Sequence, residues 1–210
     1  MSILIVAATQ LEIQPFIEGH PDADYLISGV GVAATVFHLM KRIEKNKYSF
    51  ILQVGLAGTY RDDMKLGESV IVESDCFADL GVWENKKIIS VYDLGLTNPD
   101  ESPFENGRLV NHNVYINTTQ AKKVEGVTVN LLTDDLNYVE AMRMKYNAAV
   151  ESMEGAALHY VCIQKNIPFL QIRGISNKVG ERDKSKWNFK EAIQSSNQLL
   201  SEIYISLKTN

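Results

Sequence analysis

Cysteine is scarce in this chain of 210 residues, which contains only Cys76 and Cys162. The two residues lack the spacing of metal ligands, and they are too few for the disulfide framework on which a small secreted domain depends. We therefore expect both thiols to be reduced and structural, and we expect no bound metal.

Long hydrophobic runs are also missing. The N-terminal stretch Met1–Ala8 is apolar, but it lacks the basic residues that open a signal peptide. No later run approaches the roughly 20 apolar residues that cross a bilayer. The sequence therefore predicts a cytoplasmic protein with no membrane partner.

The chain has no excess of positive charge. It carries 21 Lys and Arg against 26 Asp and Glu, which gives a formal net charge of -5, and its basic residues form no large cluster. Binding to nucleic-acid phosphates requires clustered Lys and Arg, so we expect no nucleic-acid partner.

The sequence contains no evident linker, internal repeat or low-complexity tract. Its hydrophobic content of 45% and charged content of 22% are ordinary for a globular protein, and its length is sufficient for one sizeable core. We expect a single domain over residues 1–210.

Apolar runs rich in β-branched residues alternate with helical patterns along the chain. Ile3–Ala8 is typical of a strand buried on both faces, and Trp187–Leu207 has the apolar spacing of an amphipathic helix. This alternation predicts an α/β fold, a three-layer α/β/α sandwich with a central mixed, mostly parallel sheet. Further strands are expected over residues 25–28, 50–54, 66–73, 126–133 and 167–175, and helical spacing is present over 135–146.

Polar residues and glycines follow several of the predicted strands. Glu12 follows the first strand, glycine-rich turns at 29–34 and 55–59 follow the next two, and Asn177 follows the last. Ligands bind beyond the carboxyl ends of strands in open α/β sheets, which makes these positions candidates for one shared pocket. Glu12 can alternatively be a first-turn acid that favours the helix dipole.

Gly29–Ala34 has the G-x-G-x-x-A spacing of a dinucleotide-binding turn. In that motif an acid is expected at the end of the next strand, roughly 20 residues further on. The predicted strand Phe50–Val54 is followed by Gly55 instead, so we expect no dinucleotide cofactor, and no other cofactor is indicated.

The segment Glu151–Ala157 places two acids and a methionine at one junction between a strand and a helix. A structural junction needs only one capping residue, so the additional polar residues indicate a site. The alternatives are core packing for Met153 and the role of a solvated first-turn acid for Glu154.

The motifs described above, together with Arg173–Ser176, fall in an order that resembles the nucleoside phosphorylase and nucleosidase superfamily. The resemblance covers nearly the whole chain, and its most specific parts are the Met-Glu junction and the Arg-x-Ile-Ser sequence. The methylthioadenosine/adenosylhomocysteine nucleosidases carry an Asp after Ile-Ser, where this chain has Asn177. With Phe77–Gly81 and Ser176–Asp183 followed by Trp187, the chain is similar to the futalosine hydrolases of menaquinone biosynthesis.

This resemblance implies hydrolysis of an N-glycosidic bond through an oxocarbenium-like sugar, with release of hypoxanthine from futalosine. By family position, Glu12 would activate the attacking water as general base, and Glu154 would accept hydrogen bonds from the ribose hydroxyls. Met153 would supply an apolar wall against the sugar. The family also implies a homodimer.

Asn177 bears on the choice of base. Its amide N–H can donate to O6 of a 6-oxopurine while its carbonyl accepts from the protonated N7, whereas adenine presents a donor at the 6-position. The residue therefore favours hypoxanthine or guanine as the leaving base. The alternative is an Asn that serves as a turn or cap residue.

The remaining substrate contacts are less specific. Backbone at Gly55, Ala57 and Gly58 is expected to border the pocket. Tyr138 and Phe77 are the candidates for the aromatic that stacks on the purine. Arg182 can meet the carboxylate of futalosine's benzoate arm, or it can pair with Asp183.

Phosphorolytic relatives need a basic residue in the first strand-end loop, and Thr9–Phe16 has neither Lys nor Arg. Water is therefore the expected nucleophile. Two other functions stay open, a methylthioadenosine/adenosylhomocysteine nucleosidase and a non-catalytic nucleotide-binding module on the same fold.

Overall fold

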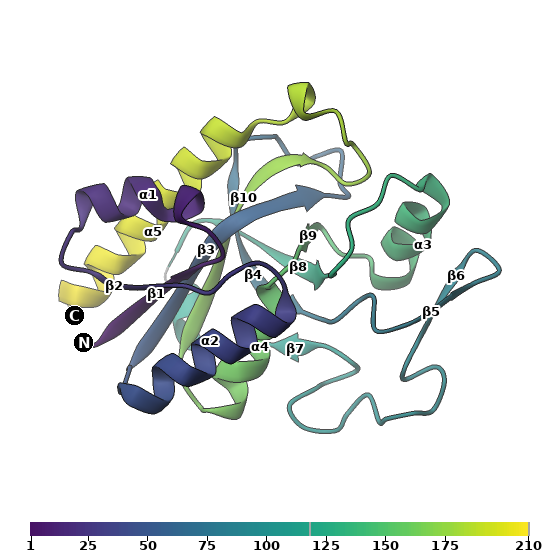
Figure 1. Cartoon of the computed structure of the whole chain (residues 1–210), viewed down its shortest axis with the longest axis horizontal. Coiled ribbons are helices and arrows are strands. Elements are labelled where there is room, and N and C mark those ends of the chain that lie inside the picture. The colour runs from purple at the N-terminus through teal and green to yellow at the C-terminus, as the bar shows by residue number, and fades with distance from the viewer. Residues whose placement is uncertain (118, 210) are drawn as a thin grey trace.

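The computed structural model describes residues 1–117 and 119–209 (Figure 1). Its main sheet has eight strands, and a separate hairpin consists of β5 (Gly81–Glu84) and β6 (Lys87–Ser90). The strands of the main sheet are β1 (Ile3–Ala7), β2 (Asp24–Ile27), β3 (Phe50–Thr59), β4 (Ser69–Asp75), β7 (Leu109–Val110), β8 (Lys122–Thr128), β9 (Val150–Ser152) and β10 (Phe169–Lys178). The helices are α1 (Gln10–Gly19), α2 (Val32–Lys45), α3 (Leu136–Tyr146), α4 (Gly155–Gln164) and α5 (Phe189–Thr209), with short 3-10 turns at Val114–Asn117 and Lys184–Lys186.

Most strand pairs are parallel, and three are antiparallel, which confirms the prediction of a mixed, mostly parallel sheet. The strand order is β10-β4-β8-β9-β3-β1-β2, and β10 also pairs with β3. This additional pairing closes five of the strands into a ring, from which β1 and β2 extend as an open sheet. Sequence periodicity identifies the buried faces of a strand but not its neighbours, so the closure was not predicted.

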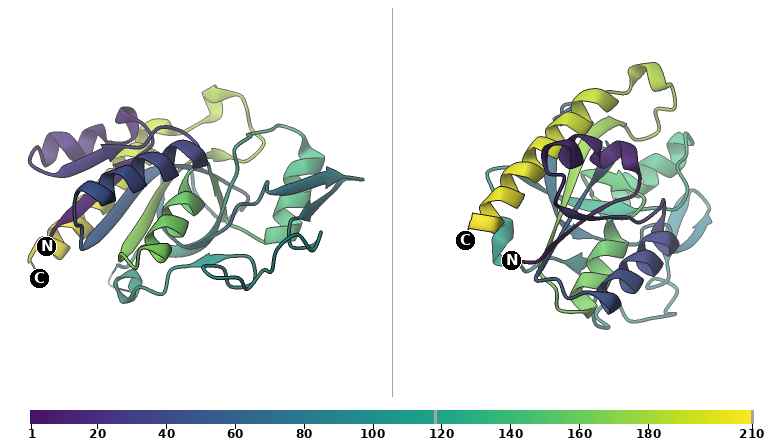
Figure 2. Two further views of the ribbon diagram at one scale, coloured as in Figure 1. Left: turned by 60° about the horizontal axis from the view of Figure 1, so that its bottom comes forward. Right: turned by 60° about the vertical axis from the view of Figure 1, so that its left-hand side comes forward.

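Side chains of β1 alternate between the two outer layers. Ile3 and Ile5 pack in a core with α1 and α5, whereas Leu4 and Val6 pack in a second core with α2 and α4. Figure 2 shows these helix pairs on opposite sides of the sheet. Because successive strand residues point to opposite faces, a strand covered by helices on both sides is apolar throughout, and the three-layer prediction is confirmed.

A third core fills the ring of strands. It includes Ala57 of β3, Val72 of β4, Val150 of β9 and Ile175 of β10. The predicted site residues Glu12, Glu154 and Asn177 lie at or just beyond the ends of strands.

The predicted boundaries of two segments in β3 and β10 are wrong. Gly55–Thr59 is not a turn but the second half of β3, and Ser176–Lys178 belongs to β10 rather than to the following loop. The cause is the long parallel pairing of β3 with β10, which continues from Ile51 opposite Phe169 to Thr59 opposite Lys178. Backbone hydrogen bonding along this ladder outweighs the low strand propensity of the two glycines.

Both cysteines are buried thiols without a disulfide. Burial raises the pKa of the Cys76 thiol to about 12, which keeps it protonated at neutral pH. In the part of the chain that the structure describes, no helix combines the length and the apolarity needed to span a membrane.

The packing of α5 on β10 depends on the absence of a side chain at Gly174. A Cβ at this position would lie 2.1 Å from the carbonyl oxygen of Ala192, a contact that forces the helix away from the strand. We expect Gly174→Ala to lower the free energy of unfolding by at least about 2 kcal/mol in urea titrations. Gly19→Ala is the matched control, because no atom lies within 4 Å of a Cβ built there, and it should leave stability unchanged or slightly higher. Equal stability of the two variants would contradict this packing.

Candidate active site

A pocket of about 280 Å³ lies at the carboxyl ends of β1, β3 and β10, where these parallel strands meet the start of α4. Four acids line it, namely Glu12, Glu151, Glu154 and Glu181, together with apolar, aromatic and basic side chains from several elements. The lining side chains include Glu12, Glu151, Met153, Glu154, Ser176, Asn177, Arg182, Trp187 and Phe189.

Glu12 stands in the first turn of α1 and takes part in a capping box with Thr9. Its Oε2 accepts hydrogen bonds from the Thr9 amide at 2.9 Å and the Thr9 hydroxyl at 2.8 Å. Its Oε1 accepts from the Leu56 amide at 3.1 Å. A carboxylate oxygen has two lone pairs, so Oε2 is saturated and Oε1 retains one acceptor position.

Glu154 is the N-cap residue of α4 and is almost fully buried. Its Oε1 accepts from the Gly31 amide at 3.0 Å, and its Oε2 lies 3.6 Å from Nη1 of Arg173. Gly31 has a φ of 88°, a left-handed conformation that favours glycine and aims its N–H at the carboxylate. Burial raises the pKa of Glu154, and Arg173 opposes that rise.

Arg173 is the largest fully buried side chain of the described residues, with 1% of its surface exposed. A Cβ at position 55 would lie 2.4 Å from its Nη1 and 3.1 Å from Oε1 of Glu12. Gly55 therefore leaves the space in which the guanidinium approaches both Glu12 and Glu154. The sequence identified Arg173 as part of a family motif but gave it no role, although an Arg inside an apolar strand is the signal that marks it.

Glu151 is the third acid of the pocket. The hydroxyl of Tyr60 donates a hydrogen bond to its Oε2. Burial raises the pKa of Glu151 to about 6, and the nearby Asp79 adds to the rise while the Tyr60 hydrogen bond opposes it. Glu151 therefore begins to take up a proton just below neutral pH.

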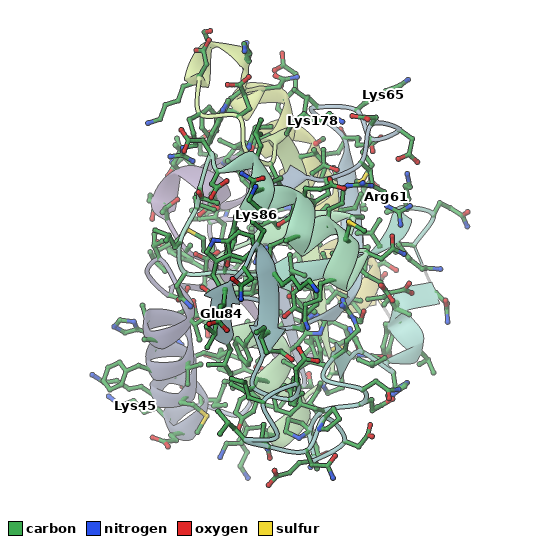
Figure 3. The ribbon with its side chains drawn as sticks, turned by 90° about the vertical axis from the view of Figure 1, so that its right-hand side faces the viewer. Lys45, Arg61, Lys65, Glu84, Lys86 and Lys178 are labelled. Atoms are coloured by element: carbon green, nitrogen blue, oxygen red, sulfur yellow. The ribbon has the colours of Figure 1, made fainter. Side chains whose placement is uncertain are left out.

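Asn177 lines the pocket from β10. Its Oδ1 accepts from the Ser176 hydroxyl at 2.7 Å, and its Nδ2 donates to the Lys178 carbonyl at 2.8 Å. An amide side chain has two N–H groups and two carbonyl lone pairs, so one of each remains for a ligand. The next side chain, Lys178, extends away to the corner of the molecule where Figure 3 shows Arg61 and Lys65.

Ala57, Gly58 and Met153 border the pocket as predicted, whereas Gly55 is not among the lining residues and instead faces the side chain of Arg173. The two stacking candidates lie elsewhere. Phe77 packs near Phe104 and Tyr160. The ring centroid of Tyr138 lies 5.1 Å from that of Trp83, and Tyr138 lines a neighbouring hollow of about 430 Å³.

The placement of Tyr138 follows from the end of β8. This strand stops at Thr128, five residues before the predicted end at 133, and α3 then begins at Leu136 beside the β5–β6 hairpin. The aromatic side chains that do line the pocket are Trp187 and Phe189, whose rings are 5.0 Å apart. Both residues follow the loop after β10. Local sequence patterns do not show whether a residue at such a position lines a pocket or is exposed to solvent.

Arg182 lies over the Trp187 ring, with its guanidinium carbon 5.5 Å from the ring centroid. The indole N–H of Trp187 donates to the Glu181 carbonyl at 3.0 Å, which fixes the ring. Asp183 accepts from the Ser185 amide instead of pairing with Arg182, and Glu181 pairs with Lys186. Within residues 1–117 and 119–209, no carboxylate forms an ion pair with Arg182.

Carboxylates around a pocket at the strand ends of an α/β sheet provide hydrogen-bond acceptors for hydroxyl groups and a base for water. The protein thus has the architecture of an α/β enzyme that acts on a small polar molecule. The chain belongs to the phosphorylase superfamily, whose family model matches residues 14–207.

Individual relatives agree with this assignment. The chain is 30% identical over 205 residues to the futalosine hydrolase of Thermus thermophilus, covering 90% of this chain and 89% of that protein. It is 28% identical over 159 residues to the 5'-methylthioadenosine/S-adenosylhomocysteine nucleosidase of Shewanella frigidimarina, covering 71% and 66%. The structure of futalosine hydrolase from Helicobacter pylori superposes with a TM-score of 0.79 at 16% identity and 97% coverage of both chains, which shows the shared fold.

Proposed function

We propose that this protein hydrolyses the N-glycosidic bond of futalosine and releases hypoxanthine and dehypoxanthine futalosine, in the futalosine route to menaquinone. The observation that carries the proposal is the amide of Asn177 in the wall of a pocket that also contains Glu12 and Glu154. The similarity to the Thermus thermophilus futalosine hydrolase over nearly the full length of both chains supports it.

The two carboxylates suit the two partners that react at C1', the ribose and the attacking water. As the bond between C1' and N9 breaks, positive charge develops on the ribose ring, and Glu154 accepts hydrogen bonds from the ribose hydroxyls. Glu12 accepts the proton of the attacking water, whose oxygen bonds to C1'. Its Oε1 is the oxygen with a vacant acceptor position, and the side chain lines the pocket.

Arg173 acts on the ionisation of Glu154. Its positive charge lies 3.6 Å from Oε2 of Glu154 and favours the ionised form that a ribose ligand requires. The side chain of Met153 forms an apolar wall of the same pocket, on the sugar side that the family position implies.

The free positions on Asn177 match a 6-oxopurine. The remaining N–H of Nδ2 donates to O6, and the remaining lone pair of Oδ1 accepts from N7–H as the departing base is protonated. Adenine would place its exocyclic amine against the amide N–H, and a buried donor facing a donor is costly. The amide therefore selects hypoxanthine over adenine.

The quaternary structure is part of the proposal. One nucleosidase domain, residues 1–210, pairs with a second copy to form a homodimer. In support, Leu131, Leu132 and Leu136 expose apolar side chains beside the pocket, a surface that a second subunit would remove from water.

Incubation of the wild-type protein with futalosine, inosine and methylthioadenosine, followed by identification of the liberated base, tests the function. We expect hypoxanthine from futalosine. Glu12→Gln, Glu154→Gln and Asn177→Ala should each lower kcat for futalosine by roughly 100-fold, because each removes a group that acts on the transition state. Thermal melting should show that these variants remain folded.

Glu84→Gln is the matched control, since this exposed acid lies on β5 outside the pocket, and it should retain wild-type turnover. Wild-type turnover in all three pocket variants would contradict the site. Release of adenine from methylthioadenosine in place of hypoxanthine from futalosine would favour the nucleosidase alternative. No base release from any of the three nucleosides would favour a non-catalytic nucleotide-binding module.

Arg182 is proposed to bind the carboxylate of the benzoate arm. Its guanidinium lines the pocket, stacks on Trp187 and carries no acid partner in the described chain, so an anionic ligand group would find a pre-oriented partner. Inosine lacks this arm and offers no such contact.

We expect Arg182→Ala to raise KM for futalosine by about tenfold, as one charge-assisted hydrogen bond is lost, and to leave KM for inosine unchanged. Lys184→Ala removes an exposed positive charge two residues away that does not line the pocket, and it serves as the control. Steady-state kinetics with both nucleosides gives the comparison. A parallel change for futalosine and inosine, or an equal effect of Lys184→Ala, would refute arm binding by Arg182.

A further inference from the structure

A chain of buried polar side chains extends from Arg173 into the sheet, away from the pocket. Nε of Arg173 donates to Oε1 of Gln171 at 2.9 Å, and Nε2 of Gln171 donates to Oδ2 of Asp75 at 3.0 Å. Oδ1 of Asp75 accepts from the Thr128 hydroxyl at 3.0 Å and from the Cys76 amide at 2.8 Å. Buried polar groups at this depth are costly unless all their partners are in place, so the arrangement is specific.

The donors and acceptors in this chain have a defined direction. A carboxylate can only accept, so Asp75 orients the Gln171 amide with its nitrogen toward Asp75 and its oxygen toward Arg173. The oxygen then accepts from the guanidinium. An amide turned the other way would place N–H against N–H at Arg173.

A second amide accepts from another nitrogen of the guanidinium. Oε1 of Gln53 accepts from Nη2 of Arg173 at 2.9 Å, while Nε2 of Gln53 has no partner among the described residues. With Nε and Nη2 each bonded to an amide oxygen, Nη1 is left facing the Leu56 carbonyl and Glu154.

The far end of the chain returns to the helix that carries Glu154. The Thr128 hydroxyl accepts from the Ala156 amide at 2.8 Å, in the first turn of α4. A Cβ at position 155 would lie 2.1 Å from Oδ2 of Asp75 and 2.4 Å from Oε1 of Gln171. Gly155 therefore leaves the space in which the Asp75–Gln171 pair lies against the start of this helix.

We propose that Asp75 and Gln171 are positioning residues of the active site, which fix Arg173 and the start of α4 relative to each other so that Nη1 faces Glu154. This inference rests on the proposed function for its kinetic consequences, but its structural content is independent of the substrate. Neither residue lines the pocket, and both act through Arg173.

Exchanging the carboxylate of Asp75 and the amide of Gln171 tests the order of donors and acceptors in this series of hydrogen bonds. Asp75→Asn turns a nitrogen toward Gln171, and Gln171→Glu places a carboxylate against Asp75, so each single variant creates a mismatch. In the double variant Asp75→Asn/Gln171→Glu, the new Asn donates to the new Glu, which still accepts from Nε of Arg173. We expect each single variant to lower kcat for futalosine by about 100-fold with KM within about threefold, and the double variant to recover most of the loss.

A readout that does not depend on the substrate accompanies the kinetics. The Nε–H resonance of Arg173, assigned by its loss in Arg173→Lys, should exchange slowly with water in the wild type and the double variant and faster in Gln171→Met, which lacks the acceptor. Thermal melting of all variants separates positioning from stability. Asn111→Leu is the control, since it removes a buried amide that bonds the Phe169 carbonyl outside this chain, and it should lower the melting temperature without lowering kcat.

The outcomes are distinct. Failure of the wild type to release hypoxanthine from futalosine refutes the proposed function, while the exchange measurement still decides the positioning. Restored melting temperature without restored kcat in the double variant means a structural pair only and overturns the inference. Slow Nε–H exchange in Gln171→Met, or wild-type kcat in either single variant, overturns it as well.

Discussion

The buried guanidinium of Arg173 is the group on which the rest of the site depends. A positive charge with 1% exposure is stable only when acceptors surround it, and here two amide oxygens, one carbonyl and the carboxylate of Glu154 do so. The same charge lets Glu154 ionise in a place where burial alone would favour its protonated form. The guanidinium of Arg173 and the carboxylate of Glu154 therefore stabilise each other's charged form. Glu154 is the acid that a ribose would contact.

The fold delivers this arrangement through the pairing of β3 with β10. The two strands run parallel from Ile51 to Thr59, so Gly55 lies directly opposite Arg173 and Gly58 opposite Asn177. Glycine at 55 opens the space between the strands and α1 in which the guanidinium and Glu12 approach each other. Closure of the sheet into a ring then brings β9 and the start of α4, with Glu154, to the same rim.

Much of this could be predicted from the sequence because it rests on local patterns. The apolar run of β1 indicated a strand covered on both faces, and Glu12, Glu154 and Asn177 stand at strand ends, which parallel strands bring together. Other features depend on contacts between distant segments. The Asp75–Gln171 bond joins β4 to β10, and no local pattern indicates which strands will be neighbours. The aromatic residue of the pocket could not be predicted for the same reason. Because β8 ends early, Tyr138 lies in a separate hollow, and Trp187 lines the pocket.

We propose that Glu12 delivers water to the anomeric carbon, although the superfamily is named for phosphorylases. The most direct test of this proposal is analysis of the sugar product when wild-type protein cleaves futalosine with and without inorganic phosphate. We expect one free dehypoxanthine futalosine for each hypoxanthine released, at a rate that does not depend on phosphate. A sugar 1-phosphate as the product, formed at a rate that rises with phosphate concentration, would contradict it.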